Sequence, residues 1–272
     1  MSSSDTRVIT SRPEKLHSYL RKVWKYRSMS WILAKRDVRI KYAQSVVGVG
    51  WVVLQPLVAV VVYTTFFSLL MQLDTTYPYV LFVVSGVIFW SLFNYVFSQG
   101  SNALLQNQDL LRKLYFPRIL LPFSKVLVAL SEFIIVFLLF VVLLVFYGMP
   151  LSLRSLVLIP VFLGVTSFGF GLALILSALT IRNRDLHHIV PFIVYFGIWL
   201  TPVFYPVTLL PGRLQELIYI NPMASYIQCF RWGFFSEPIS QFAWVGVFLG
   251  FVVLVLGVLL FKSREAEIAD SL

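Results

Sequence analysis

The sequence is poor in charge, histidine and cysteine. Only 12% of its 272 residues are charged and 59% are apolar, whereas a soluble domain carries roughly a quarter charged residues. The single cysteine, Cys229, excludes a disulfide within the chain. Three histidines leave little capacity for general-base catalysis, and no Ser/His/Asp or Cys/His set stands out. The composition therefore predicts an integral membrane protein.

Motifs for nucleotide and metal binding are also missing. The fourteen glycines never form a GxxxxGK[ST] loop, so the chain is not expected to bind ATP in that way. His187 and His188 are adjacent, but no third ligand of the right kind lies close by in sequence, and we expect no metal. A net charge of +10 would suggest nucleic acid for a soluble protein. Here the basic residues lie next to apolar runs, which favours anionic lipid headgroups as their binding partners instead.

Six apolar stretches are candidates to cross a bilayer, which takes ~20 residues as a helix. They cover roughly 49–71, 79–99, 126–147, 156–180, 189–206 and 242–261. Nineteen of the 22 lysines and arginines then lie on one side, and only Arg154, Arg213 and Arg231 lie on the other. Because basic residues accumulate in the cytoplasm, we predict an all-α integral membrane protein with six transmembrane helices and both termini cytoplasmic. Its parts are a cytoplasmic segment (1–48), the six-helix domain (49–262) and a cytoplasmic tail (263–272).

The N-terminal segment predicts an amphipathic helix that lies on the membrane surface. Ser11 and Glu14 fit a capping box at its start. Apolar residues follow at helical spacing, with basic residues mostly on the other face; the apolar ones are Leu16, Tyr19, Leu20, Val23 and Trp24. Packing against a soluble domain would give the same stripe, but no such domain is present in this chain.

Two connections are expected to contain short helices. A cytoplasmic helix over 102–116 carries Leu104, Leu111 and Leu114 on one face and is stopped by the proline at 117. Such a helix suits docking into a groove on another protein, and contact with lipid alone explains it equally well. After the fifth span, prolines and a glycine break the segment 207–222, which predicts short re-entrant or surface-lying helices on the outward side.

Aromatic residues make up 17% of the sequence and form faces on three predicted spans. A pore lined by flat rings would let sugar rings slide with many weak contacts, and ordinary packing is the alternative for any single ring. The candidate channel residues are Trp51, Tyr63, Phe66, Trp90, Phe93, Phe192, Tyr195, Phe196 and Trp199.

Glu132 is the main charge inside a predicted span. An acid in that position is a functional candidate. A proton-coupled carrier normally has several such groups, so the single acid favours a paired or snorkelling structural role, with Lys125 seven residues earlier.

The stretch 31–57 resembles the opening motif of the type-2 ABC exporter permeases that move lipid-linked polysaccharides. Charged residues are concentrated in the first half of this stretch, and none is present in it from the start of the first predicted span onward. The matching residues are Arg36, Asp37, Arg39, Lys41, Tyr42, Ser45, Gly48, Trp51, Pro56 and Leu57. Later landmarks follow in the family's order, namely Asn107, Lys113, Phe116, Pro117, Arg118, Leu121, Pro122, Arg184, Asp185, Thr201, Pro202, Val203, Tyr205, Pro206, Asn221 and Pro222.

That resemblance implies a permease subunit in the bacterial inner membrane that is not itself an enzyme. Two copies would form a homodimeric channel, with two copies of a separate ABC ATPase docked below and carrying the ATP and magnesium. The substrate would be a polysaccharide on undecaprenyl diphosphate, such as O-antigen, capsule or teichoic acid. The alternatives are a small-molecule or drug exporter on the same fold and, less favoured, an integral membrane enzyme that modifies glycans.

The resemblance also implies roles for single residues. Arg36, Arg39 and Lys41 are placed to meet the lipid diphosphate at the cytoplasmic leaflet, although the positive-inside bias alone would explain each charge. The residues expected to couple to the ATPase are Asn107, Asp109, Leu111, Arg112, Lys113 and Tyr115. The outward hairpin 207–222 would act as an outer gate, for which the named residues are Pro206, Pro211, Gly212 and Leu214.

Overall fold

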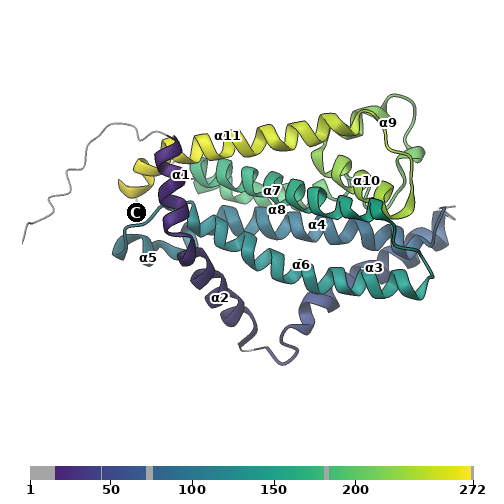
Figure 1. Cartoon of the computed structure of the whole chain (residues 1–272), viewed down its shortest axis with the longest axis horizontal. Coiled ribbons are helices and arrows are strands. Elements are labelled where there is room, and N and C mark those ends of the chain that lie inside the picture. The colour runs from purple at the N-terminus through teal and green to yellow at the C-terminus, as the bar shows by residue number, and fades with distance from the viewer. Residues whose placement is uncertain (1–15, 44, 72–75, 181–183, 271–272) are drawn as a thin grey trace, which may run out of the picture.

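The computed structural model of the chain describes residues 16–43, 45–71, 76–180 and 184–270, which contain helices and no strand. Five helices are long and apolar enough to cross a membrane. They are α3 (Gly50–Met71), α4 (Tyr79–Asn102), α6 (Leu120–Phe146), α7 (Leu158–Thr180) and α11 (Ala243–Asp270). Helices α4, α6, α7 and α11 run side by side as a bundle, and α3 is inclined to them (Figure 1); α4 contacts α3, α6 and α7, and α7 contacts α11.

The segment predicted as the fifth span, 189–206, is not one continuous helix. After α7 come η3 (Arg184–His188) and the nine-residue helix α8 (Ile189–Gly197), and the chain then continues in turns to Tyr205. Pro202 cannot donate a helical hydrogen bond, and the carbonyls of Pro202 and Val203 accept hydrogen bonds from Arg231 instead. Five of the six predicted spans are therefore present as helices long and apolar enough to cross a membrane.

Helix α4 is the most enclosed of these spans: 78% of the residues in its most apolar 18-residue stretch are buried, compared with 28% in that of α6 and 11% in that of α3. Its phenylalanines pack with rings from α6, α7 and α10 in the main core. Gly86 permits the turn after α8 to approach closely, since a Cβ there would lie 2.8 Å from the Val203 carbonyl oxygen. Tight packing of this kind stabilises helices in lipid, where apolar burial alone gains little.

One end of the bundle gathers α1 (Leu16–Lys25), α2 (Arg27–Ala43), η1 (Leu105–Asn107) and α5 (Gln108–Lys113) beside the end of α11 (Figure 1). The Arg118 backbone N–H donates to Glu265 at 2.6 Å, which ties the segment before α6 to α11. The predicted amphipathic helix is present as α1, with its Ser11–Glu14 capping box outside the described residues. One edge of α1 packs on the chain itself, since Tyr19 is buried in a second core cluster, while Trp24 is exposed.

The opposite end contains several shorter helices, and three of them (η4, α9 and η5) lie in the segment 207–222 that was predicted to be broken. Their bounds are η2 (Leu153–Val157), η4 (Val207–Leu209), α9 (Leu214–Leu217), η5 (Ile218–Ile220) and α10 (Pro222–Phe235). Asn221 caps α10 by accepting a hydrogen bond from the Met223 N–H at 3.0 Å, and Pro222 occupies the first turn. Helix α10 is largely buried and packs against α7 and α11.

Candidate functional site: a charged network beside a cavity

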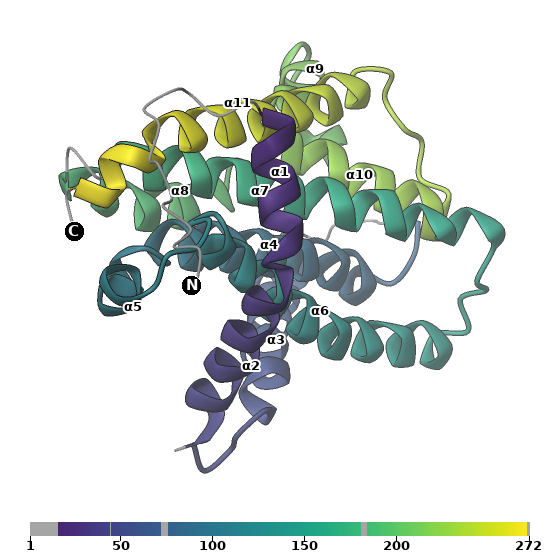
Figure 2. The same ribbon diagram turned by 60° about the vertical axis from the view of Figure 1, so that its left-hand side comes forward.

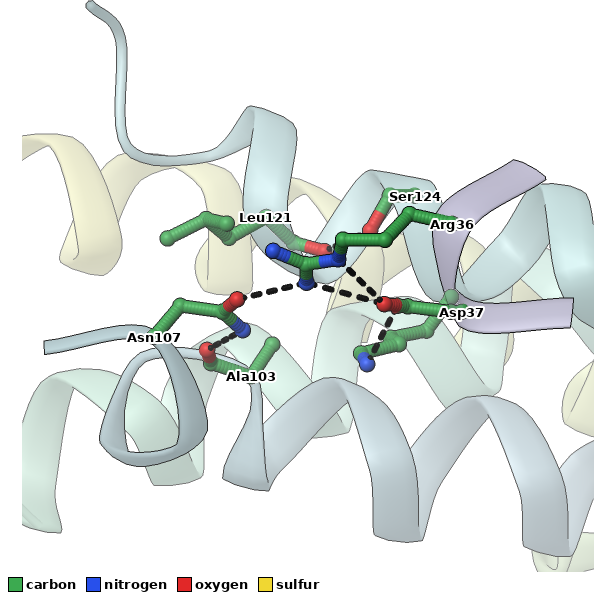
Figure 3. A network of polar contacts seen from close by, with 7 residues as sticks. Arg36, Asp37, Ala103, Asn107, Leu121 and Ser124 are labelled. Carbon is green, nitrogen blue, oxygen red and sulfur yellow. Dashed lines mark hydrogen bonds and ion pairs between the residues drawn. The ribbon is translucent and has the colours of Figure 1, made fainter. Parts of the chain in front are cut away.

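An ion-pair network joins α2 to α6 and to the segment before α5. Asp37 accepts from Lys125 Nζ at 2.6 Å and from Arg36 Nη2 at 2.8 Å. The same Arg36 nitrogen donates to Asn107 Oδ1 at 2.7 Å, and Asn107 Nδ2 donates to the Ala103 carbonyl at 2.8 Å. Figure 3 shows the guanidinium lying between the amide and the carboxylate. Because Lys125 and Asp37 are only 8% and 13% exposed, solvent screens their pair weakly.

The three cations predicted to meet a lipid diphosphate lie in different environments. Arg36 is held by Asp37 and Asn107. Lys41 donates to Glu132 at 2.6 Å and lies 4.6 Å from the centre of the Tyr95 ring. Arg39 is exposed and makes no ion pair within the described ranges. Two of these cations are thus bound within the chain, and Arg39 is open to solvent.

Glu132 is paired, as predicted, and its partners come from α2. Lys41 Nζ donates to its Oε1 at 2.6 Å and the Tyr42 hydroxyl donates to the same atom at 2.8 Å. Burial, followed by the bond to Glu132, raises the pKa of Tyr42, so that the phenol stays protonated as a donor. Lys125, the expected neighbour in sequence, binds Asp37 instead.

A cavity of about 730 Å³ lies beside the Lys41–Glu132 pair, between α2, α3, α4 and α6. Its lining includes three predicted channel residues, Trp51, Tyr63 and Trp90. Apolar side chains from α3, α4 and α6 also line it, together with uncharged polar ones, among them Ser45, Gln55, Ser91, Asn94, Tyr95, Ser98 and Gln99. The cavity therefore offers aromatic faces together with amides and hydroxyls, which suits a ligand that is both apolar and rich in hydrogen-bonding groups.

The other predicted channel residues do not line this cavity. Phe93 is 2% exposed and its ring stacks with those of Phe97 and Phe168, so it belongs to the core. The remainder are exposed on α3, on α8 and just after α8, namely Phe66, Phe192, Tyr195, Phe196 and Trp199.

The predicted cytoplasmic helix 102–116 is shorter than expected. Its last part is the six-residue helix α5, which projects from the end of the bundle (Figure 2). The candidate coupling residues divide between two environments: Asn107 and Leu111 are buried against the chain, whereas Asp109, Arg112, Lys113 and Tyr115 are exposed. Leu114 does not share the buried face, because the backbone is already extended there and its side chain is 52% exposed.

The predicted gate residues lie in the loop between α8 and α9. Pro206 precedes η4, and Gly212 has a φ of +50°, a left-handed conformation that glycine adopts readily. Pro211 stands just before this glycine, and Leu214 begins α9 with 49% of its side chain exposed.

Arg231 is the buried residue that sequence reasoning missed, since it was counted only as an outward charge. Its side chain is fully buried. The guanidinium donates to Ser85 Oγ and to the carbonyls of Phe82, Pro202 and Val203 over 2.8–3.1 Å. The available signal was a lone arginine in the apolar run of α10, because a buried cation requires partners for its donors.

Comparison with known proteins agrees with this architecture. Residues 30–235 match the ABC-2 type transporter family. An O-antigen export system permease protein RfbA of Klebsiella pneumoniae is 27% identical over 244 residues, which are 89% of this chain and 93% of the relative. The protein of the same name from Myxococcus xanthus is 29% identical over 262 residues, which are 93% of this chain and 98% of the relative. The chain belongs to the ABC-2 type transporter family.

Proposed function

We propose that this chain is the membrane permease of an ATP-driven exporter that moves lipid-linked polysaccharide. The observation that carries the proposal is the likeness to O-antigen export permeases along almost the whole of both chains. The cavity supports it, because aromatic rings and amides together suit sugars better than ions. The substrate is carried on undecaprenyl diphosphate, and the location is the bacterial inner membrane.

The proposed topology places both termini in the cytoplasm. Nineteen of the 22 basic residues then lie on that side, and α1, α5 and the end of α11 gather at one end of the bundle (Figure 1). In this arrangement α8 and the turn after it replace a sixth spanning helix. The short helices η4, α9 and η5 are surface-lying or re-entrant at the outer leaflet, where the loop 207–222 acts as the gate.

Two copies of the chain enclose the channel. Support comes from α3, because only 11% of the residues in its apolar stretch Gly50–Phe67 are buried within one chain. The exposed rings Phe66, Phe192, Tyr195 and Phe196 stand on α3 and α8, where a second copy would cover them. Exposed aromatic surface of this kind is enriched at protein interfaces.

Two copies of a separate ATPase dock on α5 through its exposed charged residues. Asn107 immediately precedes α5 and binds Arg36 of α2, and α2 in turn presents Lys41 to the cavity. A displacement of α5 by the ATPase would therefore be carried through this hydrogen bond to the cavity wall. The lipid diphosphate is met at this end, with the exposed Arg39 as its first contact.

Deletion of the gene, followed by complementation, tests this function. Cells without the chain should lose surface polysaccharide and accumulate the lipid-linked form inside, and the wild-type chain should restore export. A chain with Asn107 and Lys113 both changed to Ala should restore it poorly. Unchanged surface polysaccharide in the deletion strain would overturn the proposal.

A further inference from the structure

The open face of α4 is polar, although α4 is the most buried span. Sixteen of its 24 residues are buried. Away from the helix ends, the positions that remain open recur at i, i+3, i+4, i+7 and i+8 and all line the cavity. They are Ser91, Asn94, Tyr95, Ser98 and Gln99, and they are called the polar stripe below.

Part of the polar stripe has hydrogen-bonding groups without protein partners. Ser98 Oγ donates to Asn94 Oδ1 at 2.9 Å. Within the described part of the chain, the Ser91 hydroxyl and the side-chain amides of Gln99 and Gln55 have no hydrogen bond, although all three line the cavity. Polar side chains in a membrane span face a cavity or the protein interior rather than lipid. Their unpaired groups then require water or a polar ligand.

From this arrangement we infer that the polar stripe binds the hydroxyl groups of a neutral sugar segment of the transported glycan. The stripe lies on α4, and Trp51 and Tyr63 of α3 line the same cavity. A pyranose has hydroxyls at its edge and C–H bonds on its faces, so amides would take the edge and rings the faces. The inference rests on the proposed function and adds a site for the sugar.

The charges at the cavity favour a neutral ligand over an anionic one. Lys41 is the cation in the lining, and it is already paired with the Glu132 carboxylate. A phosphate in the cavity would meet this carboxylate, whereas a hydroxyl can donate to it. The diphosphate is therefore expected outside, near Arg39, and the sugars inside.

Leucine substitutions test the polar stripe. The variants are Ser91→Leu and Asn94→Leu, with Asn94→Gln as the conservative change. Ser131→Leu is the matched control, because Ser131 is exposed on α6 beside Glu132 but is not part of the cavity lining. Ser91→Leu should leave packing intact, since Ser91 is exposed into the cavity.

Binding is measured on the permease–ATPase complex by tryptophan fluorescence, because Trp51 and Trp90 line the cavity. The probe is polysaccharide released by mild acid from the cells that produce it. We expect roughly tenfold weaker binding for Asn94→Leu and about threefold weaker for Ser91→Leu, from the loss of one or two hydrogen bonds each. Ser131→Leu and Asn94→Gln should bind like the wild type.

Two results would overturn the inference: no binding by the wild type, or wild-type binding by both leucine variants. Export in cells separates these results from failure of the proposed function. If the deletion strain exports normally, the proposed function fails. If export requires the chain while the leucine variants bind and export normally, only the sugar site fails.

Discussion

Buried charged side chains are stabilised by different kinds of partner at the two ends of the bundle. At the end that carries α5, Asp37 is paired with Lys125 and Arg36, and Glu132 is paired with Lys41. At the other end, the hydrogen-bond partners of Arg231 among the described residues are three carbonyls and one hydroxyl, with no carboxylate. The first site joins separate helices through side chains, and the second holds a backbone turn.

This difference separates a site that can exchange partners from one that cannot. A carboxylate can release one cation and bind another, so the ion pairs on α2 are compatible with movement during transport. The carbonyls of Pro202 and Val203 have Arg231 as their donor, and loss of that side chain leaves buried acceptors unsatisfied. Arg231 is therefore expected to be a fixed part of the fold, and the α2 network is the part that we expect to rearrange.

Removal of Arg231 should have the largest effect on stability. Arg231→Met should lower the free energy of unfolding by about 3–5 kcal/mol, because several buried acceptors lose their donor at about 1–3 kcal/mol each. Arg231→Lys should retain part of that stability, because lysine has fewer donors in a less suitable geometry. Thermal unfolding in detergent measures both. Arg213→Met is the control, since Arg213 is exposed; equal effects at the two positions would contradict the role of Arg231.

Removal of Lys125 should have the next largest effect. Lys125→Met leaves Asp37 without its closest cation and should cost about 2–4 kcal/mol, because the pair is largely buried. The double variant Asp37→Leu, Lys125→Met should regain more than half of this loss, since the two buried charges are removed together and only Arg36, whose side chain is 40% exposed, loses a carboxylate partner. A double variant no more stable than Lys125→Met alone would show that the pair does not account for the effect.

Loss of the Asn107 side chain should affect stability modestly and coupling strongly. Asn107→Ala removes the hydrogen bonds to Arg36 and to the Ala103 carbonyl and should cost about 1 kcal/mol. ATP hydrolysis by the complex should continue while export per ATP falls severalfold. Gln106→Ala, at the exposed neighbouring position, is the control. Equal export per ATP for Asn107→Ala and the wild type would exclude this link.

Substitution of Arg39 should have the smallest effect on stability. Arg39→Gln should change the free energy of unfolding by less than about 0.5 kcal/mol, because its side chain is exposed. Export should nevertheless fall severalfold if Arg39 binds the diphosphate. Lys35→Gln removes an exposed charge one turn earlier on α2 and should leave export unchanged. Parallel losses from both variants would point to general surface charge instead.

Hydrophobic run length was sufficient to predict most of the bundle, because a spanning helix needs a fixed number of apolar residues. Five predicted spans correspond to α3, α4, α6, α7 and α11. The fifth predicted span was wrong as a continuous helix, because its turn is stabilised by Arg231, which is distant in sequence. Run length carries no information about such a partner.

The side of α4 that lines the cavity could not be chosen from its apolar residues. A span buried all around is apolar on most faces, so its aromatic face was a candidate for the channel. Of the two candidates on that face, Trp90 lines the cavity, whereas Phe93 packs in the core. The few polar residues were the better signal, since Ser91, Asn94 and Ser98 recur at helical spacing. The partners of Asp37 and Glu132 likewise depend on how α2 crosses α6.

The central claim is that this chain couples ATP hydrolysis on a partner to movement of a lipid-linked polysaccharide. The most direct test is ATP hydrolysis by the co-purified permease–ATPase complex, with and without that lipid-linked polysaccharide. The account predicts a stable complex of two permeases and two ATPases whose hydrolysis rate changes when the glycan is added. Failure to bind the ATPase, or a rate that does not respond to the glycan, would contradict it.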